Sequence, residues 1–471
     1  MKLVWFRNDL RVRDNHALFN ACRDSANQGV VAVAVLTPKQ WLLQDEANGR
    51  VQFWLANLRA IGEDLATLNI PLKILRAATN REVPEQLLAL VTQIKADSIY
   101  FNNEYPDYEQ KRDKRVSDLF NANGLSVACY HSDVIIEPGT VRNKQKLPFR
   151  VFTPFSKAWR TCFLHQNPEP LPLPDKQIST AIQSDPVPEE VIYGAPVASV
   201  WHRDLFPAGS DEAHRRLECF VRDKSRDYRQ LRDYPALDST SVLSPYLAVG
   251  AISARQCLAG IRTYSNDPDW LANQWTSEVI WREFYRHLLF DFPEMNRMMP
   301  FKPEVEERLT WSDDNFLFDA WCRGETGFPM VDAGMKQLLA TGWMHNRLRM
   351  VTASFLTKLL RQDWRRGAQF FMQNLVDGDF ASNLGGWQWS ASVGADAAPY
   401  FRIFNPMRQA ERFDPEGEYI ARWIPELVSL QGVQRFDPLF GAEVGRPVPI
   451  IDYGHAREQS IGDYNLAGAQ P

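Results

Sequence analysis

The first 130 residues alternate short apolar runs, rich in β-branched side chains, with stretches of helical periodicity. This alternation is typical of a parallel sheet that is buried on both faces and joined by helices, so it predicts a doubly wound α/β domain. The absence of a G-x-G-x-x-G segment gives no indication of a Rossmann dinucleotide site, and any ligand is expected at the switch point of the sheet. The expected strands are Leu3–Phe6, Val30–Leu36, Leu72–Leu75, Ser98–Phe101 and Leu125–Tyr130, and the expected helices include Val51–Leu68 and Pro84–Ile94.

The pattern changes twice further along the chain. Closely spaced prolines between positions 168 and 196 predict that residues 131–205 are a long connector. Beyond residue 206 the apolar positions are helical in period, which predicts a larger all-α C-terminal domain able to enclose a cofactor between its helices. The expected domains are therefore 1–130, 131–205 and 206–471, and the periodic helical segments are 211–231, 253–263, 271–290, 330–341, 343–361 and 365–375.

Composition narrows the class of protein. The six cysteines are scattered without a C-x-x-C pair, and no H-E-x-x-H or similar pair of ligands occurs, so neither disulfides nor a metal site is expected. No apolar run approaches the roughly 20 residues of a membrane span, and charged residues soon follow Met1, so we expect a cytoplasmic protein without a signal peptide. The net charge of −5 restricts any DNA site to a local basic surface.

The segment Trp275–Leu288 carries an unusual helix face. Glu278, Trp281, Arg282 and Tyr285 follow the spacing i, i+3, i+4 and i+7, which places them on one side of a helix. One interpretation is a half-buried helix with a simple salt bridge between Glu278 and Arg282. The other is a pocket floor, where Trp281 stacks on a flat ligand and Glu278 binds its edge.

Two segments further on add polar groups to helical patterns. Asn346 and Met350 share one face of Gly342–Trp364, as do Trp343 and Arg347; the segment is also locally basic, which alone is typical of a solvated helix face. The run D-G-D-F-A-S-N-L-G-G-W-Q-W (residues 377–389) lacks the later ligands of an EF-hand. Its carboxylates and amide suit the ring nitrogens and ribityl hydroxyls of a buried cofactor.

A cluster of hydroxyl groups precedes another expected helix. Tyr228 and the run Thr240–Ser244, T-S-V-L-S, are suited to bind phosphate through side chains and free backbone N–H groups. Simple capping of the helix is the alternative for the hydroxyls.

Taken together, these segments resemble the photolyase/cryptochrome family, and within it the bacterial class I photolyases that repair cyclobutane pyrimidine dimers. The resemblance extends over nearly the whole chain. It rests on W-F-R-N-D-L-R-V-R-D-N (5–15), V-F-T-P-F (151–155), T-S-V-L-S (240–244), W-R-E-F-Y-R-H (281–287), T-G-F-P-M-V-D-A-G-M (326–335), G-W-M-H-N-R-L-R-M (342–350), the D-G-D segment (377–389) and Y-F-R-I-F-N-P (400–406).

The resemblance implies a folded, U-shaped FAD in the helical domain. It implies phosphate-side contacts in the T-S-V-L-S segment, a partnership between Asp377 and Arg349, and Asn383 facing the flavin N5. The implied cofactor-binding residues are Tyr228, Thr240, Ser241, Val242, Leu243, Ser244, Trp275, Glu278, Arg282, Trp343, Asn346, Arg349, Asp377, Gly378, Asp379 and Asn383.

It also implies a light-driven lyase reaction, in which the reduced anionic FAD gives an electron to a dimer flipped out of the DNA. Trp281 and Trp389 would stack on the flipped bases, while Glu278 would bind a pyrimidine edge. The implied catalytic residues are Glu278, Asn346, Met350, Trp281 and Asn383, and the electron relay is Trp311, Trp364 and Trp387. The implied DNA contacts are Arg232, Glu278, Trp281, Arg282, Tyr285, Asn346, Arg347, Trp389 and Arg402.

The first domain is implied to be of the antenna type. Relatives often hold 5,10-methenyltetrahydrofolate with an Asn-Glu pair and a Cys-Lys pair, which read Tyr108-Glu109 and Asn296-Arg297 here. Glu109 and Arg297 are therefore the expected antenna residues, with a deazaflavin, another flavin or no second chromophore as alternatives.

The resemblance leaves several functions to weigh. A photolyase acting on cyclobutane dimers is favoured, because Asn and Met stand at 346 and 350 where a (6-4) enzyme would carry histidines. The resemblance also suggests a monomer. A cryptochrome photoreceptor, a single-strand-preferring cryptochrome relative and a non-photochemical flavin oxidoreductase are the alternatives.

Overall fold

The computed structural model describes residues 1–197, 199–265 and 267–466. Its contacts divide the chain into two compact units. The first unit comprises Met1–Arg226, Ser241–Asn296 and Val376–Gly378; the second comprises Asp227–Thr240, Arg297–Leu375 and Asp379–Pro471. Neither unit contains, in its described part, a helix long and apolar enough to cross a membrane.

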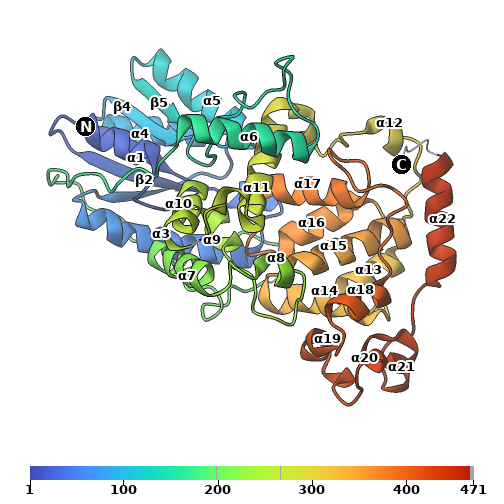
Figure 1. Cartoon of the computed structure of the whole chain (residues 1–471). Helices are drawn as coiled ribbons and strands as arrows, with labels where there is room; N and C mark the ends of the chain where they lie inside the picture. The colour runs from blue at the N-terminus through green and yellow to red at the C-terminus, as the bar shows by residue number, and fades with distance from the viewer. Residues whose placement is uncertain (198, 266, 467–471) are drawn as a thin grey trace. The chain divides into compact units, whose positions relative to one another are not determined.

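A five-stranded parallel sheet forms the N-terminal part of the first unit (Figure 1). Its strands are β1 (Lys2–Phe6), β2 (Val30–Leu36), β3 (Leu72–Arg76), β4 (Ser98–Asn102) and β5 (Ser126–Tyr130). Their order β3-β2-β1-β4-β5 reverses between β1 and β4, and every pairing is parallel. The expected doubly wound fold is confirmed, and the expected strand limits differ by at most one residue at either end.

Alternation along β1 divides the core between the two faces of the sheet. Leu3 and Trp5 belong to one hydrophobic cluster with residues of β2, β4 and the helices α4 (Val83–Ile94) and α5 (Asp107–Ala122). Each such buried side chain contributes about 1.5–3 kcal/mol relative to its exposed form. The other helices of this region are α1 (His16–Arg23), α2 (Pro38–Leu43) and α3 (Asn48–Thr67).

Within its described residues, the expected connector contains one helix, α6 (Phe152–Gln166), and its proline-rich part, 168–197, has no helix or strand. Helix α6 packs on α11 (Gln274–Asp291), where the rings of Phe155 and Phe284 lie 5.0 Å apart. The first unit also includes α7 (Ser210–Asp223), α9 (Ser244–Val249), α10 (Ala254–Tyr264) and η1 (Trp270–Ala272).

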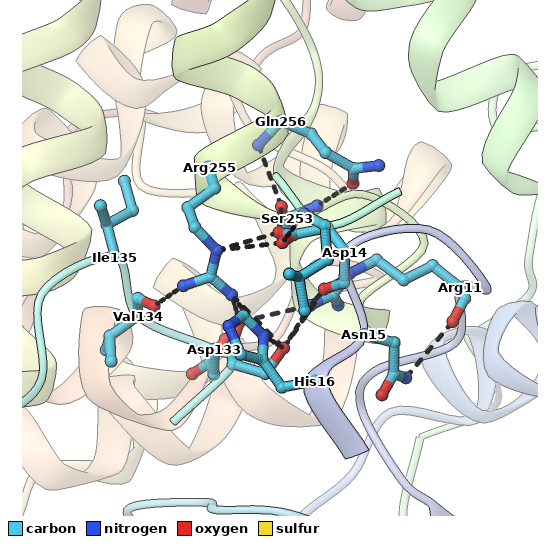
Figure 2. Close-up of polar contacts among 12 residues, drawn as sticks. Arg11, Asp14, Asn15, His16, Asp133, Val134, Ile135, Ser253, Arg255 and Gln256 are labelled. Carbon is cyan, nitrogen blue, oxygen red and sulfur yellow. Dashed lines mark hydrogen bonds and ion pairs between the residues drawn. The ribbon is translucent and has the colours of Figure 1, made fainter. Parts of the chain in front are cut away.

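A buried polar network ties the β1–α1 loop to α10 within the first unit (Figure 2). Arg255 donates to both carboxylate oxygens of Asp14 at 3.1 Å, and Asp14 and the Arg255 side chain are almost wholly buried. The carboxylate of Asp14 also accepts from the hydroxyl of Ser253, while Arg255 donates to the carbonyl of Ser132 at 3.1 Å. Burial and the neighbouring Arg255 lower the pKa of His16 to about 4, so this ring stays neutral.

The second unit is helical, as expected. Its helices are α8 (Tyr228–Leu231), α12 (Pro303–Glu306), α13 (Asn315–Arg323), α14 (Pro329–Thr341), α15 (Asn346–Ser354), the π-helix η3 (Phe355–Leu359), α16 (Trp364–Asn374), α17 (Phe380–Ser390), α18 (Pro406–Phe413), α19 (Glu418–Trp423), η4 (Pro425–Leu427), α20 (Val433–Phe436), α21 (Pro438–Glu443) and α22 (Tyr453–Leu466). The short helix η2 (Pro293–Arg297) belongs to the first unit except for its last residue, Arg297. The expected helix 343–361 was wrong in extent: α15 begins only after His345, whose ring accepts from the N–H of Arg347, and η3 follows it.

Candidate active site

In the first unit, the helix α11 brings two predicted segments together. Trp275, at the start of α11, donates from its indole N–H to the hydroxyl of Ser241 at 3.3 Å. Trp275 is 4% exposed, and its ring centroid lies 5.1 Å from that of Phe220 of α7. The segment Thr240–Ser244 is thus anchored to the helix that carries Glu278 and Trp281.

The backbone around Ser241 has the features of an anion site. Val242 has φ +47°, which is unusual for a β-branched residue and indicates a constrained loop. Leu243 is buried, yet neither its N–H nor that of Val242 donates to any described residue. Because buried N–H groups are rarely left without an acceptor, this loop fits a phosphate group.

The two charged residues of the α11 face have separate partners. Glu278 accepts from the side chain of Gln274 at 2.8 Å. Arg282 donates to the backbone carbonyl of Asp133 at 2.6 Å and pairs with its carboxylate, as does Arg286. Glu278 is thus paired with Gln274, and Arg282 with Asp133. Arg282 is held by the connector, and its contacts to cofactor and DNA stay predictions.

Trp281 is supported by a residue that the sequence did not single out. Its indole stacks face to face on Phe152, the first residue of α6, with ring centroids 3.8 Å apart and an interplanar angle of 7°. Tyr285, one turn further along α11, lies 5.6 Å from the same indole. Trp281 remains partly exposed, so it is a fixed aromatic surface rather than a core residue.

The D-G part of the D-G-D segment is held by the α/β region. Arg50 of α3 is buried and donates to the carbonyl of Gly378 at 2.8 Å, and it also pairs with Glu46 at 2.6 Å. Asp377 is likewise buried. Sequence reasoning missed Arg50, because the residue is more than three hundred positions from its partner and lies on an ordinary helix.

In the second unit, α15 displays the predicted pair of Asn346 and Met350. The amide of Asn346 lies 3.9 Å from the sulfur of Met350, as expected for residues one turn apart. Burial lowers the pKa of His345 to about 4, and its neutral ring caps the helix. Arg349 donates to the carbonyl of Met344 at 2.8 Å. The rings of Trp343 and His345 lie edge to face, with centroids 6.4 Å apart.

Helix α17 presents the second half of the D-G-D segment. Asp379 caps the helix by accepting from the N–H of Ser382 at 2.9 Å. Asn383 donates from its amide to the carbonyl of Ala368 at 2.9 Å, and its Oδ1 bonds no described residue. A Cβ added at Gly386 would meet no described atom within 4 Å. Together with the partly exposed Trp389, this face of α17 has room for a ligand.

The predicted relay of three tryptophans lies entirely in the second unit. Trp364 and Trp387 are buried, whereas Trp311 is partly exposed. Gly367, on α16 one turn after Trp364, has no room for a Cβ because the ring of Trp387 packs there. A further buried tryptophan, Trp321, contacts Trp387 with ring centroids 6.0 Å apart. No motif singled out Trp321, which occupies an ordinary apolar position of the sequence.

The arginines predicted to contact DNA differ in their surroundings. Arg347 pairs with Asp233 at 2.6 Å and lies 4.2 Å from the ring of Phe413. Arg232 lies near the same Asp233, at 3.7 Å, and over the ring of Tyr228 at 5.5 Å. Arg402 is exposed and makes no ion pair with a described residue.

A cavity opens at the switch point of the sheet, where a ligand was expected. It is lined by residues that follow β1, β2 and β4, including Arg7, Asn8, Thr37 and Glu104, and also by Glu109. Its volume is about 70 Å³, well below the roughly 300–1,000 Å³ of sites that enclose a whole drug-sized ligand. The second expected antenna residue, Arg297, belongs to the other unit.

Several polar atoms around this cavity have no hydrogen-bond partner among the described residues. They are Oε2 of Glu109, Nδ2 of Asn80 and Nε of Arg7. Burial raises the pKa of Glu109 to about 7, against the opposing influence of Arg112, while Gln44 donates to its Oε1 at 2.6 Å. These groups fit a polar ligand that reaches into the cavity with one end.

Comparisons with known proteins agree with this arrangement. Residues 2–175 match the family model described as DNA photolyase, and residues 275–465 match the FAD binding domain of DNA photolyase. A deoxyribodipyrimidine photo-lyase of Vibrio cholerae is 40% identical over 483 residues, which cover 99% of this chain and 100% of that protein.

Solved structures are similar over the same length. A class III photolyase from Agrobacterium tumefaciens superposes with a TM-score of 0.87 at 32% identity, covering 100% of this chain and 98% of that one. An archaeal photolyase from Sulfolobus tokodaii, described with two FAD molecules that imply a novel light-harvesting cofactor, superposes with a TM-score of 0.80 at 27% identity, covering 99% of this chain and 100% of that one.

Proposed function

The chain belongs to the DNA photolyase family, and on that basis we propose that it is a deoxyribodipyrimidine photo-lyase that splits cyclobutane pyrimidine dimers in DNA. The bonds broken join two carbons, which makes it a carbon–carbon lyase. The observation that carries the proposal is the joint presence of a constrained phosphate-type loop at Val242 and a stacking surface at Trp281, in a chain that matches the FAD binding domain of this family.

FAD is the cofactor to which these residues are suited. Bound in its reduced anionic form, it supplies the light-excited electron that opens the dimer and takes it back afterwards. The loop Ser241–Ser244 is suited to the phosphates, with Tyr228 and Thr240 as further contacts. Asn383, whose amide is oriented by Ala368, offers its Oδ1 to the isoalloxazine edge.

The chain's own groups then hold the lesion. Trp281, backed by Phe152, is a rigid surface for a base flipped from the stack, and Trp389 is its proposed counterpart. Glu278 binds the pyrimidine edge, with Gln274 holding the carboxylate in place. Asn346 and Met350 contact the pyrimidine ring, and Tyr285 supports Trp281. The DNA phosphates are bound by Arg232, Arg347 and Arg402.

The three tryptophans Trp387, Trp364 and Trp311 restore the reduced cofactor. Their order from buried to partly exposed suits a path from the cofactor site to the surface. An antenna chromophore is proposed with one end at Glu109, and 5,10-methenyltetrahydrofolate remains the favoured identity. The small volume of the switch-point cavity argues against a flavin enclosed there in this conformation.

We further propose that the protein acts as a monomer in the cytoplasm, with residues 1–130 serving the antenna and residues 206–471 the repair chemistry. The six cysteines are all unpaired, in keeping with a reducing compartment. The cryptochrome alternative is not favoured, because the full-length relative is named as a photo-lyase.

Lesion choice tests the proposal. Defined oligonucleotides carry a single cyclobutane thymine dimer or a single (6-4) photoproduct, in duplex and in single-stranded form. We expect light-dependent repair of the cyclobutane dimer in the duplex and none of the (6-4) product. Repair confined to the single strand would identify the single-strand-preferring relative instead.

A further inference from the structure

Trp364 has a charged partner at its indole nitrogen. Its ring is fully buried at the first position of α16, and Nε1–H donates to a carboxylate oxygen of Glu306 at 2.7 Å. Glu306 is the last residue of α12. By contrast, Trp321 donates to the backbone carbonyl of Thr352 at 3.1 Å, and Nε1 of Trp311 is buried without a partner among the described residues.

The same carboxylate controls the charge around the Trp364 ring. The guanidinium of Arg365 lies 4.6 Å from the ring centroid, where a positive charge opposes the removal of an electron from the indole. Glu306 binds that guanidinium with both oxygens, at 2.9 and 2.8 Å. Asp363 adds a second, weaker pairing at 3.2 Å. Glu306 therefore offsets the nearby cation and also places negative charge at the indole N–H.

We propose that Glu306 makes Trp364 the readily oxidised tryptophan of the relay and holds its indole proton while the ring carries the positive charge. This inference rests on the proposed relay. An oxidised indole is a much stronger N–H acid than the neutral ring, so the bond from Nε1 to the carboxylate strengthens on oxidation. The carboxylate stabilises the oxidised form more than the neutral form, which lowers the oxidation potential of Trp364.

The electrons balance along the path. The relay would supply one electron to the bound FAD, and Trp387 would be left oxidised. One electron then passes from Trp364 to Trp387, while the indole proton of Trp364 stays in its bond to Glu306. One electron from Trp311 next restores Trp364, and the positive charge has moved to the partly exposed end of the relay. No atom is gained or lost at Trp364 or Glu306.

The proposal also accounts for the direction of the path. Trp387 has two buried tryptophans to draw on, because Trp321 contacts its ring at 6.0 Å and α16 packs against it at Gly367. Both are equally buried, so burial does not separate them. The indole N–H of Trp321 donates to a neutral carbonyl, whereas that of Trp364 donates to a carboxylate. Because the carboxylate is negative, it stabilises a positive charge on Trp364 more than the carbonyl stabilises one on Trp321.

The test compares Glu306→Gln with Asp363→Asn in the full-length, FAD-loaded protein. Both variants remove one negative charge from Arg365, but only the first removes the charge from the indole N–H. Glutamine retains an acceptor for Trp364, and asparagine retains the cap at the start of α16. We expect the initial rate of flavin photoreduction with an external thiol reductant to fall about tenfold in Glu306→Gln, the factor given by about 1.4 kcal/mol. Asp363→Asn should remain near the wild type.

A second measurement needs no light. The ¹H–¹⁵N indole resonance of Trp364, identified by its loss in Trp364→Phe, should move upfield in Glu306→Gln and hold its position in Asp363→Asn. Repair by protein reduced beforehand should be the same in both variants and the wild type.

Two other outcomes would overturn the role of Glu306 or the relay itself. Equal photoreduction by Glu306→Gln and Asp363→Asn, while Trp364→Phe is blocked, would overturn the role of Glu306 and leave the relay standing. Photoreduction of Trp364→Phe at the wild-type rate would overturn the relay, and the role of Glu306 with it. Neither result bears on dimer splitting, which the pre-reduced protein reports separately.

Discussion

Two tryptophans of the second unit, Trp364 and Trp321, have the same burial, and only Trp364 is assigned to the proposed relay. Substituting Trp364→Phe should block photoreduction of the flavin, because phenylalanine is much harder to oxidise than tryptophan. Repair by protein reduced beforehand should be unchanged. Trp321→Phe is the matched control, since it removes an equally buried indole whose N–H meets only a backbone carbonyl. Steady-state illumination with absorbance detection measures both; impaired repair in pre-reduced Trp364→Phe would contradict the assignment.

Glu278 is the residue whose charge is expected to matter most for the dimer. Glu278→Ala should lower the repair yield by roughly 10- to 100-fold, the range that corresponds to losing a charge-assisted hydrogen bond. The FAD content should stay at the wild-type level, as judged by the flavin absorbance per protein. Glu278→Gln keeps the shape of the side chain and loses its charge, so it separates the effect of the charge from the effect of removing the side chain. Loss of FAD from the alanine variant would show that Glu278 serves the cofactor instead.

Glu109 predicts a specific pH dependence of stability. Its pKa is raised from 4.5 in the ordinary case to about 7 by burial. Between these values the folded protein binds more protons than the unfolded chain, so stability falls as pH rises through the window. Glu109→Gln should remove this pH dependence, whose full size across the window is at most about 3 kcal/mol. Urea unfolding at several pH values from about 4.5 to 7 measures it; parallel curves for both proteins would refute the assignment.

Among the helices, α11 both anchors itself to the connector and carries proposed site residues. Glu283, wholly buried, accepts from the N–H groups of Ile135 and Ile136 at 2.9 and 3.1 Å and from the indole of Trp159 at 3.3 Å. This fixes the helix against the connector. The opposite side of the same helix carries Glu278 and Trp281, so the anchoring of α11 positions both.

The network around Asp14 is the corresponding anchor of α10. Asp14→Asn should destabilise the protein by about 3–5 kcal/mol, because it leaves the buried guanidinium of Arg255 without its counter-charge. The surface pair Lys114–Asp118 supplies a control of the same chemistry: Asp118→Asn should change stability by less than about 0.5 kcal/mol. Thermal melts compare the two, and equal shifts would mean that the network of Figure 2 carries no special weight.

Across the whole molecule, sequence periodicity correctly predicted the features that depend only on residues close together in the chain. The limits of β2 and the pairing of Asn346 with Met350 were both correct, because each follows from local spacing. Contacts that depend on tertiary folding were missed. Phe152 under Trp281 and Glu306 beside Trp364 join residues far apart in the chain, and no local pattern reports such a contact. The contact units also interleave along the chain, which a linear reading of composition does not convey.

The decisive experiment is to measure whether dimer splitting depends on light. The purified protein, loaded with FAD and reduced beforehand, is mixed with duplex DNA that contains one cyclobutane thymine dimer, and restored thymines are counted under blue light and in the dark. We expect restoration in the light and none in the dark, with Glu278→Ala greatly slowed. Bound, reduced FAD without light-driven restoration would contradict it, and a photoreceptor function would then be the better explanation.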